Sequence, residues 1–136
     1  MTERPDLTPK DRMQIERHDV PARSAVIRSM DFNEVSLGYS QALAMEEAER
    51  CLDCNNPRCI DGCPVRVNIP NFIELLAGGD LHGAAESLLG DNALPCVTGR
   101  VCPQETQCEG LCIRAKKGEP VAVGALERFV ADWAQD

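Results

Sequence analysis

Four stretches of this chain are predicted to be helices, two of them from apolar residues that form one helical face, and no stretch alternates apolar and polar residues as a half-buried strand does. Ser40 is a suitable N-cap for the first stretch, and Asp80 can cap the third. The second stretch starts at Pro70, which suits a first helical position, and the third ends at Gly90. The predicted helices cover residues 41–51, 70–77, 81–89 and 121–134. The pattern therefore predicts an all-α fold.

Two parts of the chain lack this periodicity. Residues 1–38 are polar and contain three prolines, so we expect an extended N-terminal arm with one short helical turn around residues 23–30. Residues 91–120 are rich in glycine, proline and cysteine, which predicts loops and single helical turns. We therefore expect one folded domain, residues 39–136, preceded by an arm, residues 1–38.

Charge and composition argue against several classes of protein. The 22 acidic and 14 basic residues leave a net charge of −8, and only 4% of residues are aromatic, so the basic, stacking surface of a nucleic-acid-binding protein is not expected. No apolar run approaches the roughly 20 residues of a membrane span, and the N-terminal sequence resembles neither a secretory signal nor a transit peptide. We expect a cytoplasmic protein, in a compartment where its eight cysteines favour metal binding over disulfides.

Seven of the eight cysteines fall in two short runs. The first run reads Cys51-x2-Cys54-x4-Cys59-x3-Cys63-Pro64, and the second reads Cys102-Pro103-x4-Cys108-x3-Cys112. Such spacings let one run bind three corners of an iron–sulfur cluster while the fourth ligand comes from elsewhere, as in two-cluster ferredoxins. By this logic one cluster is held by Cys51, Cys54, Cys59 and Cys112. The other is held by Cys63, Cys102, Cys108 and one further residue.

Two residues are candidates for that further ligand. Cys96, six residues before Cys102, gives a simple count of four cysteines for each cluster. Glu127 lies on the apolar stripe of the last predicted helix, one turn after Val123. An unpaired carboxylate there would cost roughly several kcal/mol, and binding iron would satisfy it. In the alternative, Glu127 sits at the edge of the stripe and reaches water or Arg128.

Other functions compete with this interpretation. Cys51-x2-Cys54 also has the spacing of a zinc ribbon, so a structural zinc-binding interaction module is one alternative. A stand-alone, ferredoxin-like electron carrier is another. Neither a dinucleotide-binding G-x-G-x-x-G nor a phosphate-binding G-x-x-x-x-G-K-[ST] motif occurs, and no hydrolytic triad can be nominated. We therefore assign no catalytic residue and expect electron transfer by the clusters.

Three segments together resemble a known family. They are ERCLDCNNPRCIDGCPVRVNIPNFIELLAGGD, GRVCPQETQCEGLC and KKGEPVAVGALERFVADW. They are similar to the N-terminal iron–sulfur domain of the glutamate synthase small subunit, which is shared with the large subunit of NADH-dependent ferredoxin:NADP oxidoreductase and with dihydropyrimidine dehydrogenase. The resemblance extends from about residue 30 to the C-terminus.

This resemblance implies an α-helical ferredoxin-like fold with two [4Fe-4S] clusters. It implies that the clusters pass electrons between an FAD, reduced by NAD(P)H, and a second flavin or other acceptor. In relatives one cluster has four cysteine ligands, and the other has three plus a glutamine or glutamate from the final helix, which falls on Glu127. FAD and NAD(P)H are expected on a partner flavoprotein domain or subunit, alongside an acceptor subunit. Cys96 then becomes a nearby spare thiol.

Overall fold

The computed structural model describes residues 6–136, and this part of the chain is helical, as predicted. Its only β-type pairing is one isolated antiparallel bridge between Ala22 and Ser36. The α-helices are α1 (Pro9–Gln14), α2 (Ala25–Arg28), α3 (Gln41–Ala48), α4 (Arg58–Gly62), α5 (Ile69–Ala77), α6 (Leu81–Asp91), α7 (Pro95–Val101) and α8 (Val123–Gln135). Three 3₁₀ turns, η1 (Gln104–Thr106), η2 (Glu109–Leu111) and η3 (Ile113–Lys116), separate α7 from α8.

The four predicted helices correspond to α3, α5, α6 and α8. The side chain of Ser40 accepts a hydrogen bond from the backbone N–H of Leu43, and Asp80 caps α6 by accepting from Gly83. The predicted end of α6 at Gly90 was wrong, because the helix continues to Asp91. Gly90 lacks the positive φ that a glycine at a helix C-terminus often adopts.

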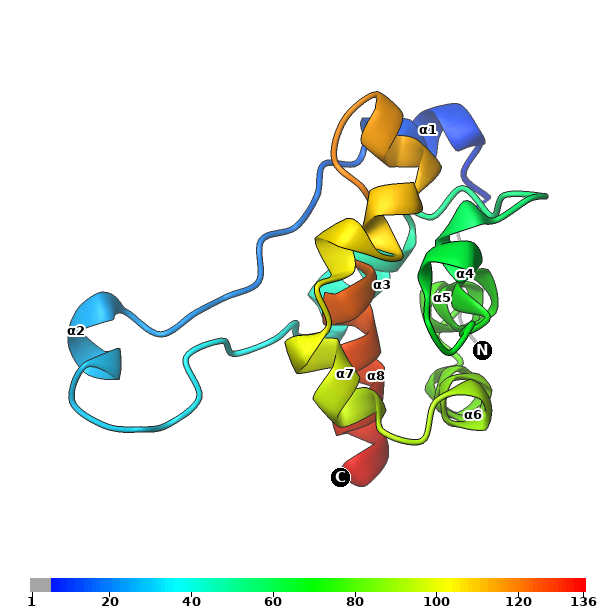
Figure 1. The fold of residues 1–136 in the computed structure, drawn as a ribbon. Helices are drawn as coiled ribbons and strands as arrows, with labels where there is room; N and C mark the ends of the chain where they lie inside the picture. The colour runs from blue at the N-terminus through cyan, green and yellow to red at the C-terminus, as the bar shows by residue number, and fades with distance from the viewer. Residues whose placement is uncertain (1–5) are drawn as a thin grey trace.

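A single apolar core lies between α3, α5, α6 and α8. Figure 1 shows α7 lying along α8, with α5 and α6 on the far side of α8. The largest apolar side chains that are fully buried are Phe72, Ile73, Leu76, Leu88, Leu126 and Val130. Each contributes about 1.5–3 kcal/mol of transfer free energy, so this core fixes α8 and the residues that α8 carries.

The N-terminal segment contains a helix that the sequence analysis did not predict. In α1, Thr8 caps the backbone N–H of Asp11, and the Asp11 carboxylate accepts the backbone N–H of Thr8 in return. The predicted turn around residues 23–30 contains α2. Figure 1 shows α2 at the end of a long loop that extends away from the other helices. In the described part of the chain, no helix has both the length and the apolar character that crossing a bilayer requires.

Candidate iron–sulfur sites

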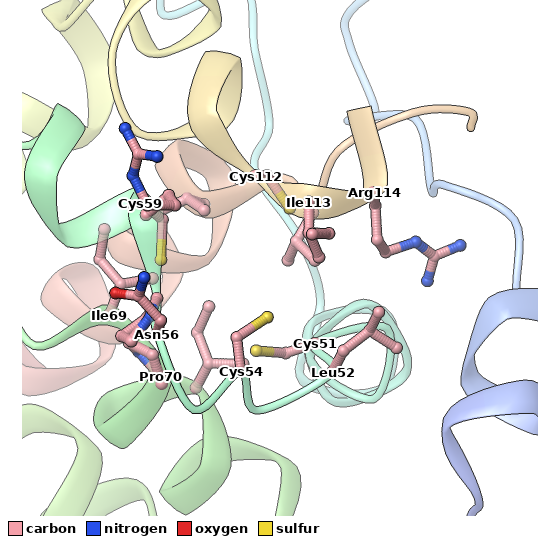
Figure 2. Close-up of a pocket in the computed structure, with 15 residues that line it drawn as sticks. Cys51, Leu52, Cys54, Asn56, Cys59, Ile69, Pro70, Cys112, Ile113 and Arg114 are labelled. Carbon is pink, nitrogen blue, oxygen red and sulfur yellow. The ribbon is translucent and has the colours of Figure 1, made fainter. Parts of the chain in front are cut away.

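Four cysteines surround one small cavity of about 70 Å³. They are Cys51, Cys54, Cys59 and Cys112, and Figure 2 shows their sulfur atoms pointing toward a shared space. Much of the remaining wall is apolar and includes Ile69, Ile73, Val121 and Val123. The structure therefore brings the first predicted ligand set together, although Cys112 comes from the second cysteine run.

The chain turns sharply between Cys51 and Cys54. Cys51 follows the end of α3, and its backbone N–H bonds the carbonyl of Ala48. Asp53 adopts a left-handed conformation with φ of +50°, which aspartate tolerates better than most residues. The backbone of Asp53 lowers the pKa of Cys51, against the larger effect of burial. This turn places two thiols of the first set on the same side of the chain.

Two arginines tie Cys112 to the first cysteine run. Arg114 donates from Nη1 to the carbonyl of Arg50 at 3.0 Å, directly before Cys51. Arg50 donates in turn to the carbonyls of Glu119 and Pro120, at 2.8 Å each. A cation at the C-terminal end of a helix such as α3 also stabilises the unpaired carbonyls there. Neither arginine was predicted in this role from the sequence.

Burial makes the thiols of the first set poor acids. Burial is the largest cause, and together with the neighbouring thiols of the set it raises the pKa of Cys51 to about 11 and that of Cys59 to about 12. Burial also raises the pKa of Cys54. Binding a metal centre therefore displaces protons from these sulfurs. Four thiols around an apolar cavity are the donor set that a [4Fe-4S] cluster takes.

A second group is formed by Cys63, Cys102, Cys108 and Glu127. Gly62 allows two of its segments to approach, because a Cβ there would lie 2.5 Å from the carbonyl oxygen of Gln107. Cys63 therefore lies against the segment that carries Cys108. Cys102 follows the end of α7, and Glu127 lies on α8, which packs against α7.

The members of this second group influence the pKa values of Cys102 and Cys108. Burial, with smaller contributions from Glu109, Cys63 and Glu127, raises the pKa of Cys108 to about 12. Burial also raises the pKa of Cys102, with Glu127 and Cys63 adding to the effect. The pKa of Glu127 is raised by burial, and its hydrogen bonds partly oppose this shift. Three thiols and one carboxylate also fit a four-iron cluster.

Cys96 lies in different surroundings. The side-chain amide of Gln135 is 2.9 Å from its sulfur, and its pKa is raised by burial and then by Asp132. Both neighbours belong to the C-terminal half of α8. The structure therefore places Glu127, rather than Cys96, near Cys102 and Cys108. The role of Glu127 as a ligand stays a prediction.

Two buried carboxylates accept backbone hydrogen bonds at the start of α8. Neither was predicted from the sequence. The N-cap of α8 is Ala122, which has no side chain that could cap the helix. Glu47 instead accepts the backbone N–H of Ala122 at 2.9 Å, and Glu109 accepts that of Gly124 at 3.1 Å. Negative charge is favourable at a helix N-terminus. These contacts fix α8, and with it Glu127, relative to both cysteine runs.

Residues 6–136 contain no cluster of three His, Cys, Asp or Glu side chains of the kind that holds a single metal ion. A [4Fe-4S] cluster is bound differently, with its protein ligands distributed over four iron atoms.

The chain matches known proteins over most of its length. Residues 28–136 match the family model described as dihydropyrimidine dehydrogenase domain II, 4Fe-4S cluster. The chain is 39% identical over 122 residues to the glutamate synthase [NADPH] small chain of Escherichia coli K12, covering 90% of this chain and 26% of that protein. It is 38% identical over 103 residues to the NAD-dependent dihydropyrimidine dehydrogenase subunit PreT of the same organism, covering 76% and 25%.

A third similar protein of Escherichia coli K12 is the putative oxidoreductase AegA, 39% identical over 108 residues, which are 79% of this chain and 16% of AegA. The chain therefore spans about a quarter or less of the length of these relatives. The family model and the identities agree with the cysteine spacing and the helical fold: this chain belongs to the 4Fe-4S domain family of dihydropyrimidine dehydrogenase domain II.

Proposed function

We propose that this chain is an electron-transfer domain of an NAD(P)H-dependent flavoprotein oxidoreductase similar to the glutamate synthase small chain. Two [4Fe-4S] clusters on residues 39–136 relay electrons between an FAD and a second flavin or other acceptor. The FAD and the NAD(P)H belong to a partner flavoprotein domain or subunit, and an acceptor subunit receives the electrons. The arm, residues 1–38, precedes the cluster-holding domain. The cytoplasm is the compartment of the whole assembly.

The observation that carries this proposal is the sorting of seven cysteines and one glutamate into two groups across the two cysteine runs. Cys112 joins the three cysteines of the first run, and Cys63 joins two cysteines of the second. Iron–sulfur proteins with two clusters exchange ligands in this way. Family membership and the names of the similar proteins support the same role.

The chain contributes ligands, shape and electrostatics. A bound [4Fe-4S] cluster supplies reversible electron uptake. The apolar wall formed by Ile73, Val121 and Val123 limits the access of water to the first cysteine group. The Glu109 carboxylate, paired with Arg17 at 3.0 Å, lies close enough to Cys108 to raise the pKa of that thiol. Such charges and exclusion of water tune reduction potential.

Anaerobic purification tests the cofactor. We expect brown protein with about eight iron and eight sulfide per chain that dithionite bleaches. We also expect that NAD(P)H alone does not reduce it, because the sequence contains no nucleotide-binding motif of the recognised types. Colourless protein with about two zinc ions and no sulfide would instead indicate a structural zinc module.

Pairs of cysteine substitutions test the exchange of ligands. Cys59→Ala with Cys112→Ala removes two ligands of one proposed cluster, so about four iron atoms should remain. Cys59→Ala with Cys63→Ala removes a ligand from each cluster, so iron should fall toward zero. If each cysteine run held its own cluster, the two pairs would give the opposite result. Iron and sulfide analysis of the anaerobic proteins distinguishes the two arrangements.

A further inference from the structure

Among the described residues, hydrogen-bond donors contact only one of the two carboxylate oxygens of Glu127. Its Oε1 accepts a hydrogen bond from Nδ2 of Asn92 at 2.8 Å and one from Oγ1 of Thr98 at 2.5 Å. Among the described residues, no donor bonds its other oxygen, Oε2. The lone pairs of Oε2 are therefore available to bind a metal. The Glu127 carboxylate lies close enough to Cys102 and Cys108 to raise the pKa of both thiols.

The orientation of Asn92 follows from its own contacts. Asn92 is 7% exposed, and its Oδ1 accepts the backbone N–H of Leu94 at 3.0 Å. The amide oxygen is engaged there, so the NH₂ group must face Glu127 and Thr98. A reversed amide would set its NH₂ group against the N–H of Leu94. Asn92 is thus fixed as a donor toward Glu127.

Thr98 is fixed as the second donor. Its hydroxyl accepts from Nδ2 of Asn92 at 2.8 Å, and its single hydrogen can go to Glu127 or to the carbonyl of Leu94. The contact with Glu127 is shorter, 2.5 Å against 3.1 Å, and a carboxylate is the stronger acceptor. Both donors therefore converge on the same oxygen of Glu127.

We propose that Asn92 and Thr98 clamp Oε1 of Glu127 so that Oε2 faces iron, and that this clamp makes position 127 selective for glutamate over glutamine. The inference rests on the proposed function, in which Glu127 completes the second cluster. Asn92 and Thr98 act as positioning residues, because they reach the cluster only through Glu127.

The selectivity follows from counting lone pairs. A carboxylate has two acceptor oxygens, so one can sit in the clamp while the other binds iron. Glutamine has one oxygen. With that oxygen in the clamp, its NH₂ group would face iron and has no lone pair to give. With the amide reversed, its NH₂ group would meet the NH₂ group of Asn92, and two donors would be left facing each other.

Substitutions of Glu127 and of Asn92 test whether position 127 is selective for glutamate over glutamine. Glu127→Gln alone should reduce iron from about eight to about four atoms per chain and abolish one of the two EPR signals of the reduced protein. Asn92→Asp in addition replaces the NH₂ group with an acceptor for the glutamine amide. The glutamine oxygen then turns toward iron, and the double variant should regain both the iron content and the signal.

A second pair of variants tests Thr98 without changing its volume greatly. Thr98→Val removes the hydroxyl, and iron chelators should strip the second cluster about 10–100-fold faster. Thr98→Ser keeps the hydroxyl and should behave as the unaltered chain. Circular dichroism on each variant checks that α7 and α8 remain folded, so that a loss of helix is not counted as a loss of ligand.

The results separate failure of the clamp from failure of the ligand assignment. If Glu127→Ala retains full iron and both EPR signals, Glu127 is no ligand, and this part of the proposed function is wrong. If Glu127→Ala loses a cluster and Glu127→Gln keeps it, Glu127 is a ligand and the clamp does not select glutamate. Failure of Asn92→Asp to rescue Glu127→Gln also overturns the clamp.

Discussion

Glu47 accepts more hydrogen bonds than any other single side chain described above. Its carboxylate accepts from Nη1 of Arg50 at 2.7 Å, from the backbone and ring of His18, and from the backbone N–H of Ala122. It is fully buried. Glu47→Gln should destabilise the chain by about 3 kcal/mol, because the new amide keeps one acceptor and leaves the buried Arg50 without its counter-charge. The shift of the urea midpoint measures this effect.

Glu46 provides a matched control on the same histidine. Its carboxylate lies 3.0 Å from Nε2 of His18, but 66% of its side chain is exposed. Glu46→Gln should therefore change the free energy of unfolding by less than about 0.5 kcal/mol. Equal effects of the two substitutions would mean that the contact to His18, rather than burial and Arg50, carries the stability.

Some single-residue features were predictable from the sequence and others were not. The spacing of Val123, Leu126 and Val130 predicted that Glu127 faces inward, since a helix repeats with a fixed period. The roles of Glu47 and Arg114 were not predictable in this way. Their key partners lie 75 and 64 residues away along the chain, and no local pattern marks a glutamate or an arginine whose partner is that distant.

At the scale of elements, the contact of α7 with α8 depends on Gly99. A Cβ at Gly99 would lie 2.8 Å from the backbone nitrogen of Arg128 and 2.9 Å from its Cα. Because backbone atoms cannot rotate away, Gly99→Ala should force the two helices apart and cost about 1–3 kcal/mol. The same movement separates Thr98 from Glu127, so one cluster should also become easier to remove with a chelator.

Gly90 in α6 is the matched control for this substitution. It is exposed, and a Cβ there would meet no atom within 4 Å. Gly90→Ala should therefore raise stability by about 0.5 kcal/mol, because alanine restricts the unfolded chain more than glycine does. Thermal unfolding of both variants should shift in opposite directions. Shifts of the same sign would mean that the approach of α7 to α8 is not tight.

Elements were predictable in proportion to their length and periodicity. The helices α5 and α8 have apolar faces that repeat regularly, and both were predicted. α1 and α4 were missed, because they have six and five residues and their formation depends on caps and neighbours. The single helical turns predicted within residues 91–120 correspond to η1 to η3, whereas α4, between Cys54 and Cys63, was not predicted.

Across the molecule, the helical core and the segments around the cysteines differ in how much their stability depends on the clusters. The core of α3, α5, α6 and α8 is packed by large apolar side chains. Six of the seven cysteines in the two runs lie in loops or at the ends of elements, and the seventh, Cys59, lies in α4. α4 and the 3₁₀ turns η1 to η3 that these loops connect have only three to five residues each. Helical segments this short are not stable alone, so the clusters themselves must supply much of their folding free energy.

Removal of iron under reducing conditions should therefore affect the chain unevenly. We expect the unfolding temperature to fall by on the order of 10 °C or more, since metal binding free energy is also folding free energy. Backbone amides in residues 54–66 and 102–117 should lose protection against hydrogen exchange, while α5 and α6 should keep most of theirs.

The loop that carries α2 is the internal reference, because Val26, Met30 and Phe32 on it are already 67%, 75% and 108% exposed. Its exchange should not change on iron removal, and an equal loss of protection in α5 would show that the clusters hold the whole domain together.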